Sequence, residues 1–466
     1  MRVAAIEIHD AGVTCILEGS DTPVVVSPGY AVYESGKLLT GWTAARKARL
    51  VPRNCHTRFW DQLDGAPLPP PFPAGIRSAD LAHAHLSSVW EAAAEKADRA
   101  ILLVPSWYSD NELGLLLGIS RACRIPVTGM VDSTLAAGLG LEGDSAIHLD
   151  LHLHRAVAAL VTRGTRYRRD TVRSDEGAGL LSLQNHWASF LAEKFVRETR
   201  FDPLHEASTE QRLYDRMPDL LEALRERETE SLVFELGSKE HGIEVSRGEL
   251  ARAALPFYRR ILEVARSLVG SAASGPRTEP RLRISSRIAA LPGIAEMLAR
   301  EISFELVPLP PGIATQNVLA HRHRLPHAGK NDGAIPFVTS LPLDDAGDDP
   351  GAASPAPEAM RERTERIPTH VLWDGVAHPI DPGPFHLGVD IPEGARGVNV
   401  SGPVAGISRR HCTIVRIDGR VAVEDHSRYG SYVNGKRVEE RAFLRAGDRL
   451  RLGTPGVEVQ LIEVKS

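Results

Sequence analysis

Apolar and polar residues alternate along the first part of the chain in blocks that predict strands followed by helices. Ala100–Val104 is a continuous apolar run that Pro105 ends, as expected of a strand buried on both faces. Ser109–Glu112 has the spacing of a capping box, which predicts the start of a helix. A second apolar run at 126–131 precedes a helix rich in small residues at 133–139. This order is typical of an α/β architecture.

Strand-like and helix-like patterns recur in the rest of the first part, and the last part of the chain has short β-like runs only. Val3–Ile8 and Val13–Leu17 are short β-like runs around a turn. Apolar residues recur at helical spacing over 180–195, and a second capping box at Ser246–Glu249 precedes another such stripe. Over 370–462, short β-like runs alternate with Gly, Asp and Pro turns, which predicts an all-β sandwich.

A polar segment separates these two parts. Residues 341–360 hold four prolines, two glycines, five alanines and five acidic residues, so they cannot bury enough apolar surface to fold. We therefore expect a flexible acidic linker over 326–367, an α/β domain over 1–325 and a β-sandwich domain over 368–466.

Composition narrows the classes of function. The 466 residues are 42% hydrophobic and 25% charged, which is ordinary for a globular protein of two or three domains. The formal net charge of −5, without a basic stripe, argues against a nucleic-acid partner. The first apolar run is too short for a signal peptide or a membrane span, and the four cysteines are widely spaced. We expect a cytoplasmic protein with no membrane partner.

Four stretches of the first part carry a family resemblance. They are Ile-Leu-Leu-Val-Pro-Ser-Trp-Tyr-Ser-Asp at 101–110, Val-Asp-Ser-Thr-Leu-Ala-Ala-Gly-Leu at 131–139, Asp-Glu-Gly-Ala-Gly at 175–179 and Leu-Pro-Gly-Ile-Ala-Glu-Met-Leu at 291–298. Their residues and their order resemble the nucleotide-binding domain of the DnaK-type heat-shock chaperones, in the actin-like ATPase superfamily. The resemblance implies an actin-like fold of two lobes, each a ribonuclease H-like half.

The same resemblance implies the extent of each lobe. The first lobe would cover about residues 1–143 and the second about 144–325. A helical insertion in the second lobe would cover about 180–270, where the helical stripes occur.

Nucleotide sites of this superfamily depend on two glycine-rich hairpins, because a Cβ would occupy the space of the phosphates. At the first hairpin this chain has Glu7 and Asp10 within Glu-Ile-His-Asp-Ala, where the family has Asp-Leu-Gly-Thr-Thr. At the second, Asp150 remains but His152 and His154 stand at glycine positions. These five residues mark a vestigial nucleotide site, so we expect a pseudo-ATPase without bound ATP or magnesium. The alternative is an ATP-dependent, DnaK-like chaperone or conformational switch.

The histidines also raise the alternative of a metal site. His148, Asp150, His152 and His154 alternate, so on one strand all four would face the same side. Imidazoles and a carboxylate suit zinc, nickel or iron. Neighbours two apart on a flat strand are about 6–7 Å apart, which is too far for all four to reach one ion. We therefore expect no metal cofactor.

Two motifs in the last part carry a second resemblance. They are Gly-Ile-Ser-Arg-Arg-His at 406–411 and Glu-Asp-His-Ser-Arg-Tyr-Gly-Ser-Tyr-Val-Asn-Gly at 424–435. They resemble the loops of a forkhead-associated (FHA) domain, whose pattern is a Gly-Arg pair, then Ser-Arg-x-His, then Ser-x-Asn-Gly-Thr. Domains of this family read phosphothreonine in other proteins and have no catalytic activity.

The FHA resemblance assigns a role to each motif residue. Ser408 would donate its hydroxyl to the phosphate, with Arg409 beside it. Arg428 would lie next to the phosphate, and Ser431 would keep the hydroxyl of the motif threonine. Tyr429 replaces the motif asparagine, which in the family bonds the ligand backbone.

Three further residues would support these loops. The resemblance makes His411 a structural residue that pins the loops, and it places Gly388 and Gly430 in the same framework. The residue after Gly388 is Val389, so the arginine of the family's Gly-Arg pair is missing. Phosphate-independent protein binding therefore stays open beside phosphothreonine binding.

Together these features predict a non-catalytic adaptor. The FHA module would bind a Thr-phosphorylated protein, the actin-like domain would hold a second protein, and the linker would set their effective concentration. One candidate phosphosite lies in the chain itself. Thr364 has an aliphatic residue three places on, which is a spacing that many FHA domains prefer.

Overall fold

The chain consists of two compact units, Met1–Ala346 and Gly347–Ser466. The structure is a computed structural model that describes residues 2–140, 145–163, 166–273, 280–325, 335, 337–342, 367–373, 376–380, 383–392, 394–400, 406–417, 420–434, 436–445, 448–453 and 457–462. None of the helices in these ranges combines the length and the apolar composition that a membrane span requires.

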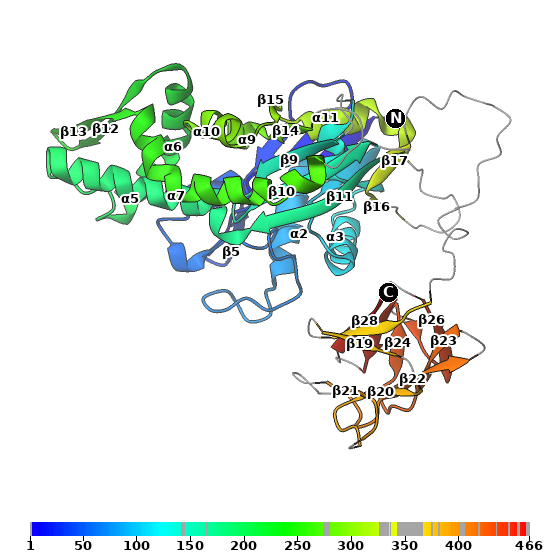
Figure 1. The fold of residues 1–466 in the computed structure, drawn as a ribbon. Coiled ribbons are helices and arrows are strands. Elements are labelled where there is room, and N and C mark those ends of the chain that lie inside the picture. Colours follow the sequence, from blue (N-terminus) through cyan, green and yellow to red (C-terminus); the bar gives the residue numbers. More distant parts are fainter. Residues whose placement is uncertain are drawn as a thin grey trace. The chain divides into compact units, whose positions relative to one another are not determined.

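The first sheet of the first unit has the strand order β16-β8-β7-β1-β2-β3 (Figure 1). Strand β1 is antiparallel to β2 and parallel to β7, β2 is antiparallel to β3, and β7 is parallel to β8. Strand β7 contains the predicted apolar run, which is buried throughout. The bounds are β1 (Val3–Glu7), β2 (Val13–Leu17), β3 (Val25–Ser27), β7 (Arg99–Val104), β8 (Val127–Asp132) and β16 (Phe337–Val338).

The second sheet of this unit has the order β15-β14-β9-β10-β11-β17. Strands β9, β10 and β11 are antiparallel neighbours, whereas β9, β14 and β15 are parallel. The bounds are β9 (Ser145–Leu151), β10 (Ala156–Arg163), β11 (Arg166–Asp175), β14 (Arg281–Ile284), β15 (Glu305–Pro308) and β17 (Ser340–Pro342). From β3 to β8 and from β11 to β15, the two sheets therefore repeat the same strand order and directions.

Helices bury the faces of these sheets. α2 and α3 share a core with β1, β2 and β7, while α4 and α11 lie in a core that takes residues from both sheets, including Ala5 and Val161. α11 was expected in the second lobe, but its buried Val318 and Leu319 pack in this shared core, against β1 and α4. The bounds are α2 (Ser78–Glu91), α3 (Asp110–Ala122), α4 (Ser133–Gly138), α9 (Ser286–Ala289), α10 (Ile294–Glu301) and α11 (Ile313–Ala320). The first unit also contains a small sheet and a short helix, with β4 (Ala31–Glu34), β5 (Lys37–Thr40), β6 (Cys55–His56) and α1 (Gly41–Ala45).

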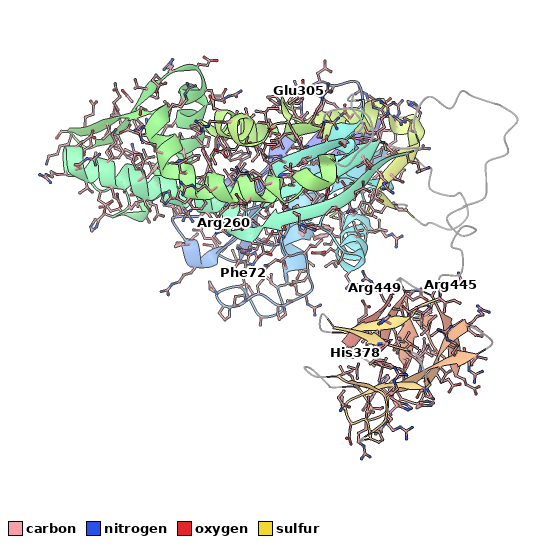
Figure 2. All side chains as sticks on the ribbon, viewed as in Figure 1. Phe72, Arg260, Glu305, His378, Arg445 and Arg449 are labelled. Carbon is pink, nitrogen blue, oxygen red and sulfur yellow. The ribbon has the colours of Figure 1, made fainter. Side chains whose placement is uncertain are left out.

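The insertion after β11 is not purely helical, contrary to the sequence prediction. Between its helices, β12 and β13 form an antiparallel hairpin. Leu232 and Phe234 on one strand and Ile243 and Val245 on the other are buried, at the two-residue period of a strand with one face in the core. The bounds are α5 (Leu180–Thr199), α6 (Ala207–Glu226), β12 (Thr229–Leu236), β13 (Lys239–Ser246), α7 (Arg247–Arg266) and α8 (Val269–Ala273). α7 is tied to the end of β11 by Arg260, whose Nε donates to Asp175 Oδ2 at 2.9 Å (Figure 2).

Part of the predicted linker is structured. Residues 337–342, which we call the strap, form β16 beside β8 in the first sheet and β17 beside β11 in the second. The reason is local composition, because Val338 and Leu341 are apolar and buried in the core shared by the two sheets. Thr364 and residues 343–366 lie outside the described residues.

The second unit is a β-sandwich. One sheet has the order β19-β18-β28-β27-β24-β25 and the other β21-β20-β22-β23-β26. Apolar residues of both sheets form a single core, which includes Val371, Leu387, Ile414 and Leu450. The bounds are β18 (His370–Trp373), β19 (Val376–Pro379), β20 (Phe385–Gly388), β21 (Gly397–Asn399), β22 (Cys412–Ile417), β23 (Arg420–Asp425), β24 (Ser431–Val433), β25 (Lys436–Arg437), β26 (Arg441–Leu444), β27 (Arg449–Leu452) and β28 (Val457–Ile462).

A buried histidine of α2 makes the first unit sensitive to acid. His85 is fully buried, and Trp60 Nε1 donates to its Nδ1 at 2.9 Å. Its Nε2 therefore carries the proton and donates to Ser27 Oγ at 2.7 Å. Burial lowers the pKa of His85 from 6.5 to about 3. His85 thus stays neutral in the folded state at pH values where it binds a proton in the unfolded state.

We expect the free energy of unfolding of the first unit to fall as the pH drops from 6.5 towards 3, by about 3 kcal/mol at a pH of about 4.5 from His85 alone. Urea unfolding of the full chain at a series of pH values measures this. His85→Gln removes the titrating group, so the free energy of unfolding of this variant should fall less steeply as the pH drops. An equal slope in both proteins would contradict the assignment.

Candidate functional site

The two hairpin turns expected at the nucleotide site lie against each other in the first unit. The turn between β1 and β2 carries His9 and the turn between β9 and β10 carries His152, and their imidazole rings stack with centroids 3.6 Å apart and planes 13° apart. Both side chains are almost completely buried. Two stacked imidazoles therefore fill the space between the two turns.

Asp10 joins the two turns through its carboxylate. Its Oδ1 accepts the Leu153 amide at 2.8 Å and His152 Nδ1 at 3.1 Å. Burial raises the pKa of the Asp10 carboxyl, but the bond from His152, the charges of His152 and His9 and the Leu153 amide outweigh it and lower the pKa below its ordinary value. Among the described residues, Oδ2 of Asp10 is buried without a hydrogen-bond partner.

Asp150 lies on the opposite side of the two rings. His9 accepts the Ala11 amide on Nδ1 at 3.2 Å, so its Nε2 carries the proton and donates to Asp150 Oδ2 at 3.2 Å. Burial raises the pKa of Asp150, but the charge and hydrogen bond of His9 and the charge of Arg287 hold it well below its usual range. Burial, together with Arg287, lowers the pKa of His9 to about 3.

The remaining predicted residues of this site point elsewhere. Glu7 is buried, and burial raises its pKa although the charge of Arg287 opposes the shift. With His148 and Asp150 it lines a cavity of about 230 Å³. His154 donates from Nε2 to the carbonyl oxygen of Thr57 at 3.0 Å.

The alternating histidines thus do not share one face of a strand. Strand β9 ends at Leu151, and His152 and His154 belong to the turn that follows. His9, which stacks on His152, was not among the residues predicted for this site.

A larger cavity of about 680 Å³ opens beside the two turns, within the first unit. Ala11 and Leu153 line it next to the turns, and Arg287 lines both cavities. Farther along, the Arg49 guanidinium lies 3.7 Å from the ring centroid of Tyr214. Aromatic and charged groups lie together in this cavity, a combination that small-molecule and peptide sites use.

Two ion pairs connect the part of the first unit that contains the first sheet, here called its first half, with the part that contains the second sheet, its second half. Asp61 accepts Arg155 Nε at 2.6 Å, and the Asp61 side chain is fully buried. Asp132, at the start of α4, accepts Arg169 Nε of β11 at 3.0 Å. The Asp132 carboxylate thus pairs with an arginine of the other sheet.

In the second unit, His411 links the two FHA-like loops. It is fully buried, its Nδ1 accepts the Ser408 amide at 3.0 Å, and its Nε2 donates to the Gly430 carbonyl oxygen at 3.1 Å. The amide fixes Nδ1 as the acceptor, so Nε2 carries the proton. The imidazole thus holds the loop before β22 against the loop before β24.

Four predicted ligand residues come together on these loops. Ser408 Oγ accepts the Arg428 amide at 3.2 Å, which leaves the hydroxyl proton for another acceptor. The side chains of Arg409 and Arg428 are exposed. Tyr429 is 50% exposed, and the Arg428 guanidinium lies 5.9 Å from its ring centroid. Hydroxyl and guanidinium donors on adjoining rigid loops are suited to hold a phosphate group.

Ser431 differs from its predicted role as a ligand contact. It is fully buried, and its hydroxyl donates to Asp425 Oδ1 at 2.9 Å, so it supports the loop from inside. Gly388 and Gly430 are glycines for structural reasons. A Cβ at Gly388 would lie 2.0 Å from the Arg409 carbonyl oxygen, and Gly430 has a φ of +82°.

Comparison with known proteins identifies the domain that carries the two loops of the second unit. The β-sandwich and its paired loops define a protein-interaction module of the phosphopeptide-binding class. Residues 396–453 match the family model of the FHA domain. A search of curated proteins found no significant match to the chain.

Proposed function

We propose that this chain is a non-catalytic adaptor whose FHA domain binds a Thr-phosphorylated protein through Ser408, Arg409 and Arg428. The observation that carries the proposal is the hydrogen bond from the Arg428 amide to Ser408 Oγ, because it joins the backbone of one loop to the side chain of the other. A phosphothreonine has about two negative charges and three acceptor oxygens. A hydroxyl and two guanidinium groups match that charge and that number of acceptors.

We infer that the first unit is an actin-like pseudo-ATPase which holds a second protein. The repeated strand order of its two sheets supports two related halves. The stacked His9 and His152 support the loss of nucleotide binding, because imidazoles fill the space that glycines leave for phosphates. The ion pairs of Asp61 and Asp132 across the two halves support a rigid scaffold.

The phosphate dependence can be tested with a degenerate phosphothreonine peptide library and its unphosphorylated counterpart. We expect the full chain to enrich phosphorylated peptides. Ser408→Ala and Arg428→Ala should each weaken binding of a selected peptide by about 10–100-fold, because each removes a charge-assisted hydrogen bond. Isothermal titration calorimetry measures the affinities.

Arg441→Ala is the matched control for lost positive charge. Arg441 is exposed and pairs with Glu424 on β23, outside the two loops. We expect its affinity to stay within about twofold of the unchanged protein, since exposed ion pairs contribute little. Equal binding of phosphorylated and unphosphorylated peptides would replace the proposal with phosphate-independent protein recognition.

The pseudo-ATPase part is tested separately with magnesium and ATP. We expect neither a shift in the melting temperature of the first unit nor release of phosphate, since a nucleotide that does not bind the folded state cannot stabilise it. Saturable ATP binding with turnover would favour the DnaK-like switch. Either result leaves the phosphopeptide measurement unaffected, because the two sites belong to different units.

A further inference from the structure

We propose that His9, Asp10 and His152 form a binding site for one divalent transition-metal ion, of which Zn²⁺ fits best. The ligand atoms would be the Nδ1 atoms of both imidazoles and the carboxylate of Asp10. One possible ligand atom of each of these three residues already lies within 4.8 Å of the others. Two histidines and one carboxylate are a donor set that zinc uses where a fourth position stays open.

The spacing of the donors is close to what such an ion requires. Oδ1 of Asp10 lies 3.1 Å from His152 Nδ1 and 3.7 Å from His9 Nδ1. Donors at about 2.0 Å from a tetrahedral ion are about 3.3 Å apart. The stacked rings must tilt so that both lone pairs converge, and His9 Nδ1 must release the Ala11 amide. The change is local to the two turns.

Asp150 completes the pattern from the other side of the rings. Its Oδ2 lies 3.2 Å from His9 Nε2 and 3.8 Å from His152 Nε2. A histidine that binds a metal through one nitrogen usually donates its other N–H to a carboxylate, which fixes the ring and its tautomer. Asp150 therefore holds the His9 ring by a hydrogen bond and lies close to the His152 ring, on the side opposite to Asp10.

The free oxygen of Asp10 is a second, independent sign of a ligand. Oδ2 is buried without a partner among the described residues, and Asp10 is 2% exposed. A buried acceptor without a partner costs about 1–3 kcal/mol, or more for a charged group. A divalent cation held by both oxygens of the Asp10 carboxylate would satisfy Oδ2 and balance the charges of Asp10 and Asp150, while the proton on His152 Nδ1 would pass through solvent to Nε2, so that a neutral imidazole binds the ion.

The site lies beside a route for exchange with solvent. Ala11 and Leu153, which follow Asp10 and His152 in the chain, line the cavity of about 680 Å³. A water or a small ligand from this cavity could take the fourth position. Because the donors come from both turns, the ion would fasten the two halves of the first unit together.

The test uses full-length protein without an affinity tag, stripped with a chelator and titrated with Co²⁺ and with Zn²⁺. We expect one equivalent of Co²⁺ to produce the visible absorption of a tetrahedral site, and Zn²⁺ to displace it. His152→Gln should weaken binding more than about 100-fold and Asp150→Asn about 10–100-fold, as for an outer ligand partner. Unfolding of each stripped variant, followed by circular dichroism, verifies that it still folds.

His154→Gln is the matched control, because this histidine lies in the same turn and bonds Thr57 instead. We expect unchanged Co²⁺ affinity and absorption. The proposal is overturned if Co²⁺ binding does not saturate near one equivalent, or if His154→Gln weakens it as much as His152→Gln. In that case the imidazoles and carboxylates hydrogen-bond directly to one another without an ion.

Discussion

Replacing Arg155 with alanine is expected to lower the free energy of unfolding of the first unit by about 3 kcal/mol. Removal of one partner from a buried ion pair costs about 3–5 kcal/mol, because the other charge stays buried without compensation. The Asp61 side chain is fully buried and that of Arg155 is 9% exposed. The low end of the range applies because Arg58 still contacts Asp61 at 2.9 Å. The Arg155 guanidinium also lies 4.9 Å from the ring centroid of Trp107, and the loss of this cation–π contact lowers the free energy of unfolding by a smaller amount.

Chemical unfolding and differential scanning calorimetry of the full chain can each measure the effect. The two units have separate cores, so the transition of the first unit can be followed by itself. Arg260→Ala is the control, because it removes an arginine from the ion pair with Asp175 on the exposed surface. It should cost less than about 1 kcal/mol. If both variants lose the same stability, the pair of Arg155 and Asp61 does not connect the halves as described.

The second large effect is expected in the FHA domain, where His411→Ala should cost about 2–4 kcal/mol and also abolish measurable phosphopeptide binding. The substitution removes a buried ring and leaves the Ser408 amide and the Gly430 carbonyl without their partner. Each unpaired buried group costs about 1–3 kcal/mol. Ser408 would lose its fixed position, so binding would fall further than the loss in stability alone explains.

The comparison variant is His426→Ala. His426 is exposed, and its Nε2 lies 3.1 Å from Thr413 Oγ1. We expect a stability loss below about 1 kcal/mol and an affinity within about threefold of the unchanged protein. The linking role of His411 is wrong if its variant melts and binds like the His426 variant.

The FHA domain was recognisable from sequence because its loops need particular residues at fixed spacing. A buried imidazole between two loops, and a glycine at a positive φ, restrict His411 and Gly430 to one residue type each. Ser431 shows the limit of this reasoning. A serine hydroxyl can face a ligand or the interior, and strand β24 turns this one inward, which a motif does not encode.

In the first unit, local signals gave correct predictions and distant pairings did not. The capping boxes at Ser109 and Ser246 start α3 and α7 as expected, because all their partners lie within four residues. The short strands of the strap depend on β8 and β11, each more than 150 residues away in the chain. The strap has few apolar residues of its own, and in the sequence it was therefore predicted to be part of the linker. The contact of His9 with His152 is equally non-local.

The strap also determines where tension enters the first unit. A pull on the second unit reaches residue 342 along the chain, so the ladder of β17 with β11 carries the load before any other. The pairing of β16 with β8 is loaded next, after β17 has detached. A force applied between the two units would therefore detach the strap from the second sheet and then from the first. The cores around the two sheets would stay packed while the strap detaches.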